Sequence, residues 1–296
     1  MELNMARKHK VFFITLGCIV VIALGLTTRA YLKNSASEFE DHTLYSELLD
    51  EHRKFFIRLP ANYDPSKTYP LIIKMDGNFN LSRWHNTLTI YAEQGIVEES
   101  ILVALPNQFW TDTRNRDLVP PYARKEVSIG ARPAFENDPA IFGRADVFLS
   151  FIEKELLPYL EANYSLNDNR ILTGFSAGGS FVLYTLSTKP TLFDGYFAFS
   201  PAAWYDDSVV VNEFAKSLSA LNQSEIFLYL SLGADENPII TGSFKGLLAA
   251  LEQNKEHTIT WKFSYSEGAG HNENPYVSVP KALHEYYQFR GATFSD

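Results

Sequence analysis

The stretch from Arg170 to Ser180 constrains the fold of this chain more than any other. A short apolar strand is followed at once by Gly-Phe-Ser-Ala-Gly and then by residues that favour a helix. Gly-x-Ser-x-Gly between a strand and a helix is typical of a nucleophile elbow, in which the chain reverses sharply at the serine. Gly174 and Gly178 omit the side chains that would collide at such a reversal. The pattern predicts that Ser176 projects its hydroxyl from a sheet edge and that the Ala177 amide is free at a helix N-terminus to stabilise an oxyanion.

Apolar runs of strand length alternate with amphipathic helical patterns through most of the chain. This alternation predicts an α/β protein with a mostly parallel sheet and helices on both faces, and no repeat or second domain is recognised. Pro158 is expected to bend or end one helix, and Pro280 to open the last one. Strands are expected at 71–75, 101–105, 195–199, 226–232 and 259–265, and helices at 145–157, 177–189, 244–251 and from 280 onward.

The first 33 residues are expected to direct export. Three basic residues precede an apolar run over 11–26, and small residues follow it. This order is that of a secretory signal peptide, and the run is also within reach of an uncleaved anchor, so residues 11–28 are a candidate membrane anchor. The protein is therefore expected to be periplasmic, secreted or anchored outside the cytoplasm. Residues 34–46 are expected to be a linker, which leaves 47–296 as one folded domain.

Composition excludes some classes of partner and of site. The formal net charge of -9 disfavours nucleic acid, which is bound through clustered Lys and Arg. The one cysteine, Cys18, lies in the N-terminal apolar run, so the folded domain has no disulfide and no cysteine-based metal site or nucleophile. The sequence gives no reason to expect a metal or cofactor.

Three loops after predicted strands carry residues suited to nucleophilic catalysis. Ser176 lies in the first, Asp235 and Glu236 in the second, and His271 follows Gly-Ala-Gly in the third. Serine, acid and histidine in this order match the triad of an α/β-hydrolase. A serine hydroxyl needs an imidazole within hydrogen-bond reach, and a carboxylate fixes the tautomer of that imidazole. Glu236 is preferred as the acid, although spacing alone leaves Asp235 open.

Two further parts of the site are expected from neighbouring loops. The second oxyanion donor should be the backbone amide of Gly77 or Asn78, in the loop after the strand at 71–75. The long segment 109–138 and Trp204 are expected to form a wall of the substrate site, the alternatives being a salt-bridged surface loop and simple core packing.

Several runs together resemble the esterase D-like family of α/β-hydrolases, and the resemblance covers roughly 47–287. The matching runs are Tyr69 to Asn78, Arg116-Asp117-Leu118, Glu155 to Tyr159, Gly174 to Gly179, Ser200-Pro201 with Trp204, and Gly270-His271. The branch of enterochelin- and salmochelin-type siderophore esterases is the most similar, with feruloyl and acetyl-xylan esterases as cousins.

The resemblance implies a serine carboxylic-ester hydrolase with no metal or cofactor and a small-molecule ester as substrate. Ser176 would be the nucleophile, His271 the base and Glu236 the acid. Phe175 stands where many relatives have histidine, and some siderophore esterases work with a Ser-His dyad. The alternatives are an acyltransferase on the same scaffold and a non-catalytic binding protein that kept the fold. Siderophore, plant-wall and simple acyl esters all remain open.

Overall fold

The computed structural model describes residues 38–107, 112–123, 143–221 and 225–291. The chain divides into a unit of residues 1–40 and a unit of residues 41–296, and the fold below is that of the second unit. The proposed leader and anchor at 1–33 lie outside the described residues.

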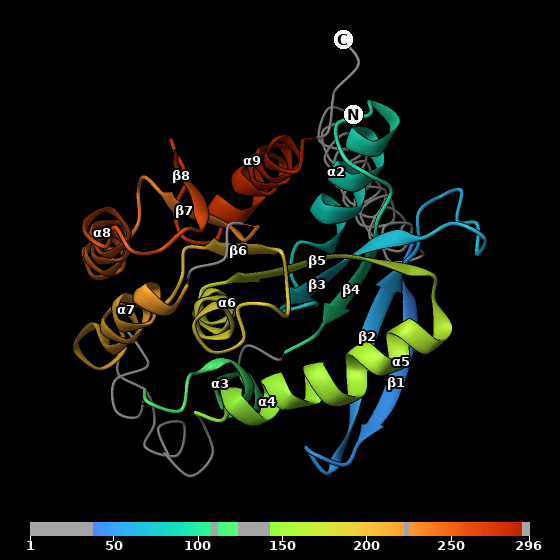
Figure 1. Cartoon of the computed structure of the whole chain (residues 1–296), viewed down its shortest axis with the longest axis horizontal. Coiled ribbons are helices and arrows are strands. Elements are labelled where there is room, and N and C mark those ends of the chain that lie inside the picture. Colours follow the sequence, from blue (N-terminus) through green and yellow to red (C-terminus); the bar gives the residue numbers. More distant parts are fainter. Residues whose placement is uncertain (1–37, 108–111, 124–142, 222–224, 292–296) are drawn as a thin grey trace, which may run out of the picture. The chain divides into compact units, whose positions relative to one another are not determined.

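Eight strands form a single sheet in the order β1-β2-β4-β3-β5-β6-β7-β8 (Figure 1). β2 pairs antiparallel with β4, and every pair from β4 to β8 is parallel. The mostly parallel sheet predicted from the alternation of strands and helices is confirmed. The strands are β1 (Glu40–Ser46), β2 (Glu51–Arg58), β3 (Tyr69–Met75), β4 (Ile101–Leu105), β5 (Leu166–Phe175), β6 (Gly195–Phe199), β7 (Phe227–Gly233) and β8 (Thr260–Ser266).

Helices cover both faces of this sheet, which is why its central strands are apolar on both sides. α2 (Leu81–Glu93) and α9 (Asn274–Phe289) cover one face (Figure 1). The other face carries α4 (Ala145–Phe151), α5 (Leu157–Asn163), α6 (Ala177–Thr188), α7 (Tyr205–Ser217) and α8 (Pro238–Gln253). A shorter helix, α3 (Asp112–Leu118), follows β4.

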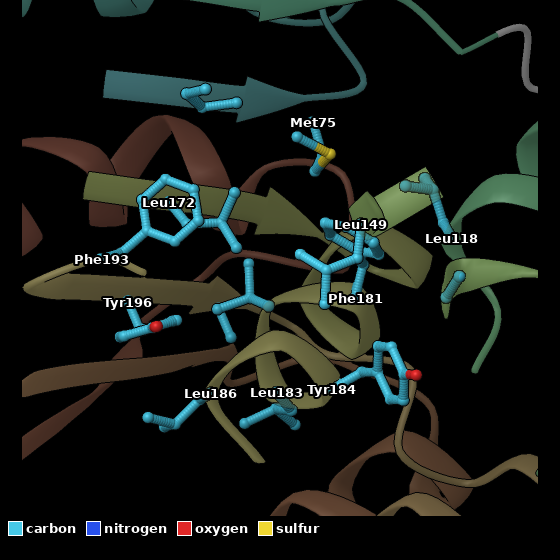
Figure 2. Close-up of a cluster of buried hydrophobic side chains, with 14 of the residues drawn as sticks. Met75, Leu118, Leu149, Leu172, Phe181, Leu183, Tyr184, Leu186, Phe193 and Tyr196 are labelled. Carbon is cyan, nitrogen blue, oxygen red and sulfur yellow. The ribbon is translucent and has the colours of Figure 1, made fainter. Parts of the chain in front are cut away.

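The largest hydrophobic core lies around α6. Its residues from Ala177 to Leu186 are all buried, which matches a sequence without a polar face. Figure 2 shows part of this core, where Phe181 of α6 gathers with Leu149 of α4, Leu172 of β5 and Met75 of β3. This packing fixes the N-terminus of α6, and with it the elbow, against the centre of the sheet.

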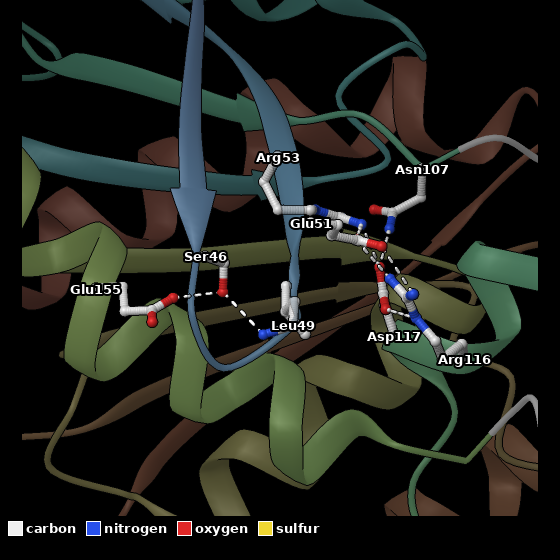
Figure 3. Close-up of polar contacts among 8 residues, drawn as sticks. All are labelled: Ser46, Leu49, Glu51, Arg53, Asn107, Arg116, Asp117 and Glu155. Carbon is white, nitrogen blue, oxygen red and sulfur yellow. Dashed lines mark hydrogen bonds and ion pairs between the residues drawn. The ribbon is translucent and has the colours of Figure 1, made fainter.

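The expected linker at 34–46 is wrong for its second half, because Glu40–Ser46 forms edge strand β1. Its polar residues alternate with half-buried ones, a pattern that an edge strand with one solvated face produces and that resembles a linker. Ser46 ends the strand, donates a hydrogen bond to Glu155 and accepts one from the Leu49 amide at 3.0 Å (Figure 3).

The helix predicted at 145–157 continues past Pro158. A π-helical turn over Ile152–Leu156 joins α4 to α5, and the Leu157 N–H donates to the Ile152 carbonyl five residues back. The wider turn accommodates the proline ring and its missing N–H, so Pro158 sits in the first turn of α5 instead of ending the helix.

Pro280 does not open the last helix, which begins six residues earlier at Asn274. A proline inside a helix leaves the carbonyl four residues back without its usual donor. That carbonyl belongs to Tyr276, and it accepts a hydrogen bond from Arg83 Nε of α2 at 2.8 Å. The contact supplies the missing donor, and Pro275 is the proline that stands in the first turn.

Candidate active site

Ser176 occupies a strained turn between β5 and α6. Its φ of 55° and ψ of -117° lie where non-glycine residues are rarely found. The turn is held on both sides: the Ser176 amide donates to the Phe199 carbonyl at 3.0 Å, and its carbonyl accepts from the Ala202 amide at 2.9 Å. Backbone strain of this kind persists only where the surroundings fix it, and it is typical of functional sites.

The glycines around Ser176 permit close backbone approaches. A Cβ on Gly174 would lie 2.2 Å from the Gly178 carbonyl oxygen, and one on Gly179 would lie 2.8 Å from Cα of Pro201. A Cβ on Gly178 would lie 3.1 Å from Cβ of Met75. The sharp backbone reversal predicted from the motif is confirmed. Gly179, which is not part of the motif, also permits a close backbone approach.

Of the two amides predicted as second oxyanion donors, only Asn78 fits. The Gly77 amide donates to the Leu105 carbonyl at 2.6 Å, so the prediction for Gly77 is wrong. The approach is so close that a Cβ on Gly77 would lie 2.6 Å from the Ala104 carbonyl carbon. No hydrogen bond of the Asn78 amide occurs among the described residues. Ala177 is the first residue of α6, where helix geometry leaves amides without intrahelical acceptors.

A buried ion pair lies behind the elbow, and sequence reasoning missed it. Asp76, with a φ of 52°, is fully buried, and each of its carboxylate oxygens accepts from Arg114 at 2.8 Å. Arg114 also approaches the Phe175 carbonyl at 3.5 Å. The bidentate pair ties the turn after β3 to helix α3 and to the elbow strand.

Glu236 and His271 form a second pair, in which the carboxylate is buried and the imidazole is half-buried. Glu236 Oε2 lies 2.7 Å from His271 Nδ1. Its other oxygen accepts from the Gly233 amide at 2.8 Å and from Ser200 Oγ at 2.5 Å, and its side chain is fully buried. Asp235 is exposed, so the structure brings together His271 and Glu236 and leaves Asp235 aside. A carboxylate at Nδ1 directs the other ring nitrogen outward as a proton acceptor.

A buried polar network supports the Glu236 carboxylate. Asn274 Nδ2 donates to Ser200 Oγ at 2.8 Å and to Ser231 Oγ at 3.0 Å. Asn274 Oδ1 accepts from Ser266 and Ser278, each at 2.7 Å. Both polar atoms of the Asn274 side chain are hydrogen-bonded in this network. The network therefore holds the Glu236 carboxylate rigidly. Its only sequence signal is a serine within two residues of the end of three successive strands.

His271 lies beside the elbow. Its ring centroid is 4.6 Å from that of Phe175, the residue before Ser176. No hydrogen bond joins Ser176 Oγ to the imidazole within the described part of the chain, and their catalytic pairing stays a prediction. Catalytic hydrogen bonds are often long in a free enzyme and tighten when substrate binds.

An aromatic pocket of about 420 Å³ is lined in part by Phe175. Phe79 stacks on Phe175 with centroids 5.2 Å apart and meets Tyr276 edge-on at 5.6 Å. Asn272 and Glu273, the two residues after His271, complete the lining. The pocket therefore adjoins the turn that carries Asn78, the elbow strand and the histidine loop.

Trp204 stands just before α7 and is half-buried. It packs edge-on against Tyr205 at 5.5 Å, and its buried indole N–H has no hydrogen-bond partner among the described residues. Its role as a substrate wall stays a prediction. Of the expected wall segment 109–138, only residues 112–123 are described, and the rest lies outside the described residues.

Arg116 and Asp117, which the family resemblance singled out, belong to a structural ion-pair network (Figure 3). Asp117 lies 2.8 Å from Arg53 and 2.7 Å from Arg116, and Arg116 also binds Glu51 at 2.7 Å. Burial raises the pKa of Asp117 and the two arginines oppose that rise. The network joins α3 to β2, and Asn107 after β4 donates to Asp117 at 3.3 Å.

No group of three metal-binding side chains occurs in the described ranges. Within the same ranges, no helix combines the length and apolar character needed to cross a membrane.

A mostly parallel sheet, a strained serine at the turn into its central helix, and a histidine–carboxylate pair beside that serine define an α/β-hydrolase. The family model described as "Putative esterase" matches residues 46–294, and the chain belongs to this family. It is therefore a carboxylic ester hydrolase.

Relatives and solved structures agree with this assignment. Ferri-bacillibactin esterase BesA of Bacillus subtilis is 28% identical over 79% of this chain and 85% of its own length. The siderophore enterobactin esterase of Emericella nidulans is 30% identical, and the match spans about half of each chain, 49% of both. The BES protein from Bacillus cereus superposes with a TM-score of 0.73 at 27% identity, covering 83% of this chain and 95% of that one. An IroE-like serine hydrolase from Shewanella oneidensis, with a TM-score of 0.74 at 23% identity over 85% and 80%, shows the fold.

Proposed function

We propose that this protein is a serine esterase that hydrolyses siderophore esters outside the cytoplasm. The observation that carries the catalytic part is the hydrogen-bonded pair of Glu236 and His271, 2.7 Å apart, beside the strained turn at Ser176. The substrate class rests on similarity to relatives named as esterases of ferri-bacillibactin and of enterobactin.

In the proposed mechanism, Ser176 Oγ attacks the ester carbonyl while His271 Nε2 takes its proton. Glu236 holds Nδ1 and stabilises the imidazolium that forms. The amides of Ala177 and Asn78 bind the tetrahedral oxyanion, and His271 then gives the proton to the leaving alcohol. Water attacks the acyl-enzyme with His271 again as the base, which releases the acid and restores Ser176.

The aromatic pocket supports a substrate with an aryl group. Its volume of about 420 Å³ lies in the range of small-molecule sites, and three of its five lining residues are aromatic. Aromatic rings bind well against other rings in offset or edge-on arrangements. The pocket lies next to the histidine loop, so a ring placed there would hold an ester near the proposed nucleophile.

The proposed location rests on the N-terminal segment alone. A basic start, an apolar run over 11–26 and the small residues after it favour export, with cleavage or anchoring as the two outcomes. Periplasmic, secreted and anchored forms would all act on an ester outside the cytoplasm.

Turnover of a panel of esters tests the proposal. The panel contains p-nitrophenyl butyrate, aryl esters and a catecholate siderophore with and without iron. Ser176→Ala should abolish turnover of every ester that the natural protein cleaves, whereas the exposed Ser219→Ala should leave it unchanged. Retained turnover in Ser176→Ala would remove Ser176 from its role, and failure of the siderophore arm alone would remove only the substrate class.

A further inference from the structure

Lys74 is a buried cation that the proposed mechanism does not use. It lies on β3, two residues before Asp76, and is 4% exposed. Side chains two apart on a strand share a face, so Lys74 points the same way as the fully buried Ile72. Its surroundings are mostly apolar and include Trp84, Phe199 and Pro275, around a cavity of about 10 Å³.

Among the described residues, no carboxylate forms an ion pair with Lys74. Both oxygens of the nearby Asp76 carboxylate bind Arg114. The two hydrogen bonds of Lys74 Nζ in the described part of the chain go to main-chain carbonyls, that of Met75 at 3.1 Å and that of Asp76 at 2.8 Å. Burial lowers the pKa of Lys74 to about 7, against the opposing effect of Asp76. A cation that is buried at a cost to stability and forms no ion pair in the described ranges indicates a role other than stability.

The Asp76 carbonyl belongs to the turn that carries the proposed oxyanion donor, and the Met75 carbonyl directly precedes that turn. The peptide between Asp76 and Gly77 is hydrogen-bonded on both sides, because the C=O and N–H of a trans peptide point in opposite directions. Lys74 Nζ binds its carbonyl, and its N–H donates to the Leu105 carbonyl at 2.6 Å. The next peptide ends in the Asn78 amide, and its direction follows from the plane of this peptide together with φ and ψ of Gly77.

Other contacts show why the turn needs this restraint. Asp76 has a φ of 52°, an unfavourable backbone conformation for aspartate. Its carbonyl also accepts from the Phe79 amide at 2.9 Å, which closes a turn over 76–79. Lys74 is the one side chain among the described residues that holds this carbonyl, and Arg114 holds the carboxylate of the same residue.

We propose that Lys74 is a positioning residue for the oxyanion hole, fixing the Asp76–Gly77 peptide so that the Asn78 amide points at the reacting carbonyl. The proposal rests on the ester hydrolysis proposed above. Lys74 touches no substrate and acts through the backbone. Because the oxyanion forms only in the transition state, loss of this restraint lowers kcat and leaves KM nearly unchanged.

Lys74→Met tests the proposal, because methionine is unbranched, is only one atom shorter than lysine and has no hydrogen-bond donor in its side chain. With p-nitrophenyl butyrate, kcat should fall about tenfold or more, since a displaced oxyanion donor loses part of the 10²–10³-fold effect of a missing one. Thermal stability should be equal or higher, because a buried charge is removed. Ile72→Met, on the same face of the same strand, is the control and should keep its kcat.

Lys74→Gln provides a second variant, because its amide N–H can still donate to a carbonyl and should retain more of kcat than Lys74→Met. Wild-type kcat in both folded variants would overturn the proposal. A loss of kcat that only accompanies a loss of stability, or one equalled by Ile72→Met, would also overturn it. If the natural protein cleaves no ester, or if Ser176→Ala still does, the proposed function fails instead, so the two failures are distinguishable.

Discussion

The carboxylate of Glu236 is hydrogen-bonded to Nδ1 of His271 at 2.7 Å, although 35 residues separate the two in the chain. The loop after β7 supplies the acid and the loop after β8 supplies the histidine. Parallel strands end at the same edge of a sheet, so the fold brings these loops together beside the elbow after β5. The proposed nucleophile, acid and base therefore all lie at this edge of the sheet.

Replacing the acid tests whether the pair acts as part of a triad or whether a dyad suffices. Glu236→Gln keeps the size of the side chain but removes the charge that stabilises a protonated His271. A triad predicts a fall in kcat of roughly 10²–10⁴ on p-nitrophenyl butyrate. Asp235→Asn, an exposed neighbour, should keep its kcat. A small effect of Glu236→Gln would establish that the serine and histidine work without the acid.

The aromatic pocket predicts a selective change in substrate binding. Tyr276→Ala removes an edge-on contact with Phe79 and opens one wall of the pocket. KM for an ester of a hydroxybenzoic acid should rise about threefold or more, the effect of losing one aromatic contact. KM for an aliphatic ester of the same alcohol should not change. An equal rise for both esters would show that the pocket does not bind the ring.

The elbow predicts an intolerance to a single methyl group. In Gly174→Ala the new Cβ would lie 2.2 Å from the Gly178 carbonyl, so the backbone must shift. Urea unfolding should show a loss of about 1–3 kcal/mol, and activity should fall with it. Gly242→Ala is the matched control, because its Cβ would meet nothing within 4 Å in the middle of α8. That variant should gain about 0.5–1 kcal/mol from its better helix propensity.

Lys74 predicts a pH dependence of stability. Its pKa is lowered from 10.5 to about 7 in the folded state, so between these values the unfolded chain binds more protons. Stability therefore rises with pH in this window, and the penalty of the buried charge is fully present below it. Urea unfolding at a series of pH values should show a smaller rise in Lys74→Met. Parallel curves for the two proteins would mean that the lysine is not perturbed.

The sequence predicts the elements that carry strong local patterns. The central strands are largely apolar runs, and the glycines at 174 and 178 mark a backbone reversal with close approaches around them. The order of serine, acid and histidine along the chain also predicts that an acid from the pair Asp235 and Glu236 lies near His271. Spacing alone leaves the choice between the two open, and the structure selects Glu236. These features depend on spacing along the chain, which is visible without a structure.

The features that the sequence does not reveal depend on contacts between distant segments. The π turn before Pro158 and the Arg83 contact with the Tyr276 carbonyl allow prolines inside helices, and neither has a local signal. The Gly77 amide is taken by Leu105, on the neighbouring strand, so the choice of Asn78 needs the register of β3 and β4. Edge strand β1 resembles a linker because it is polar on one face.

The most direct test of the central claim is covalent labelling with a fluorophosphonate, followed by mass spectrometry of the digested protein. Only an activated serine reacts readily, because phosphonylation needs a base to take the proton and an oxyanion hole to receive the charge. The account predicts one adduct, on Ser176, and its loss in His271→Ala. Absence of an adduct on the folded protein, or an adduct on a different residue, would contradict it.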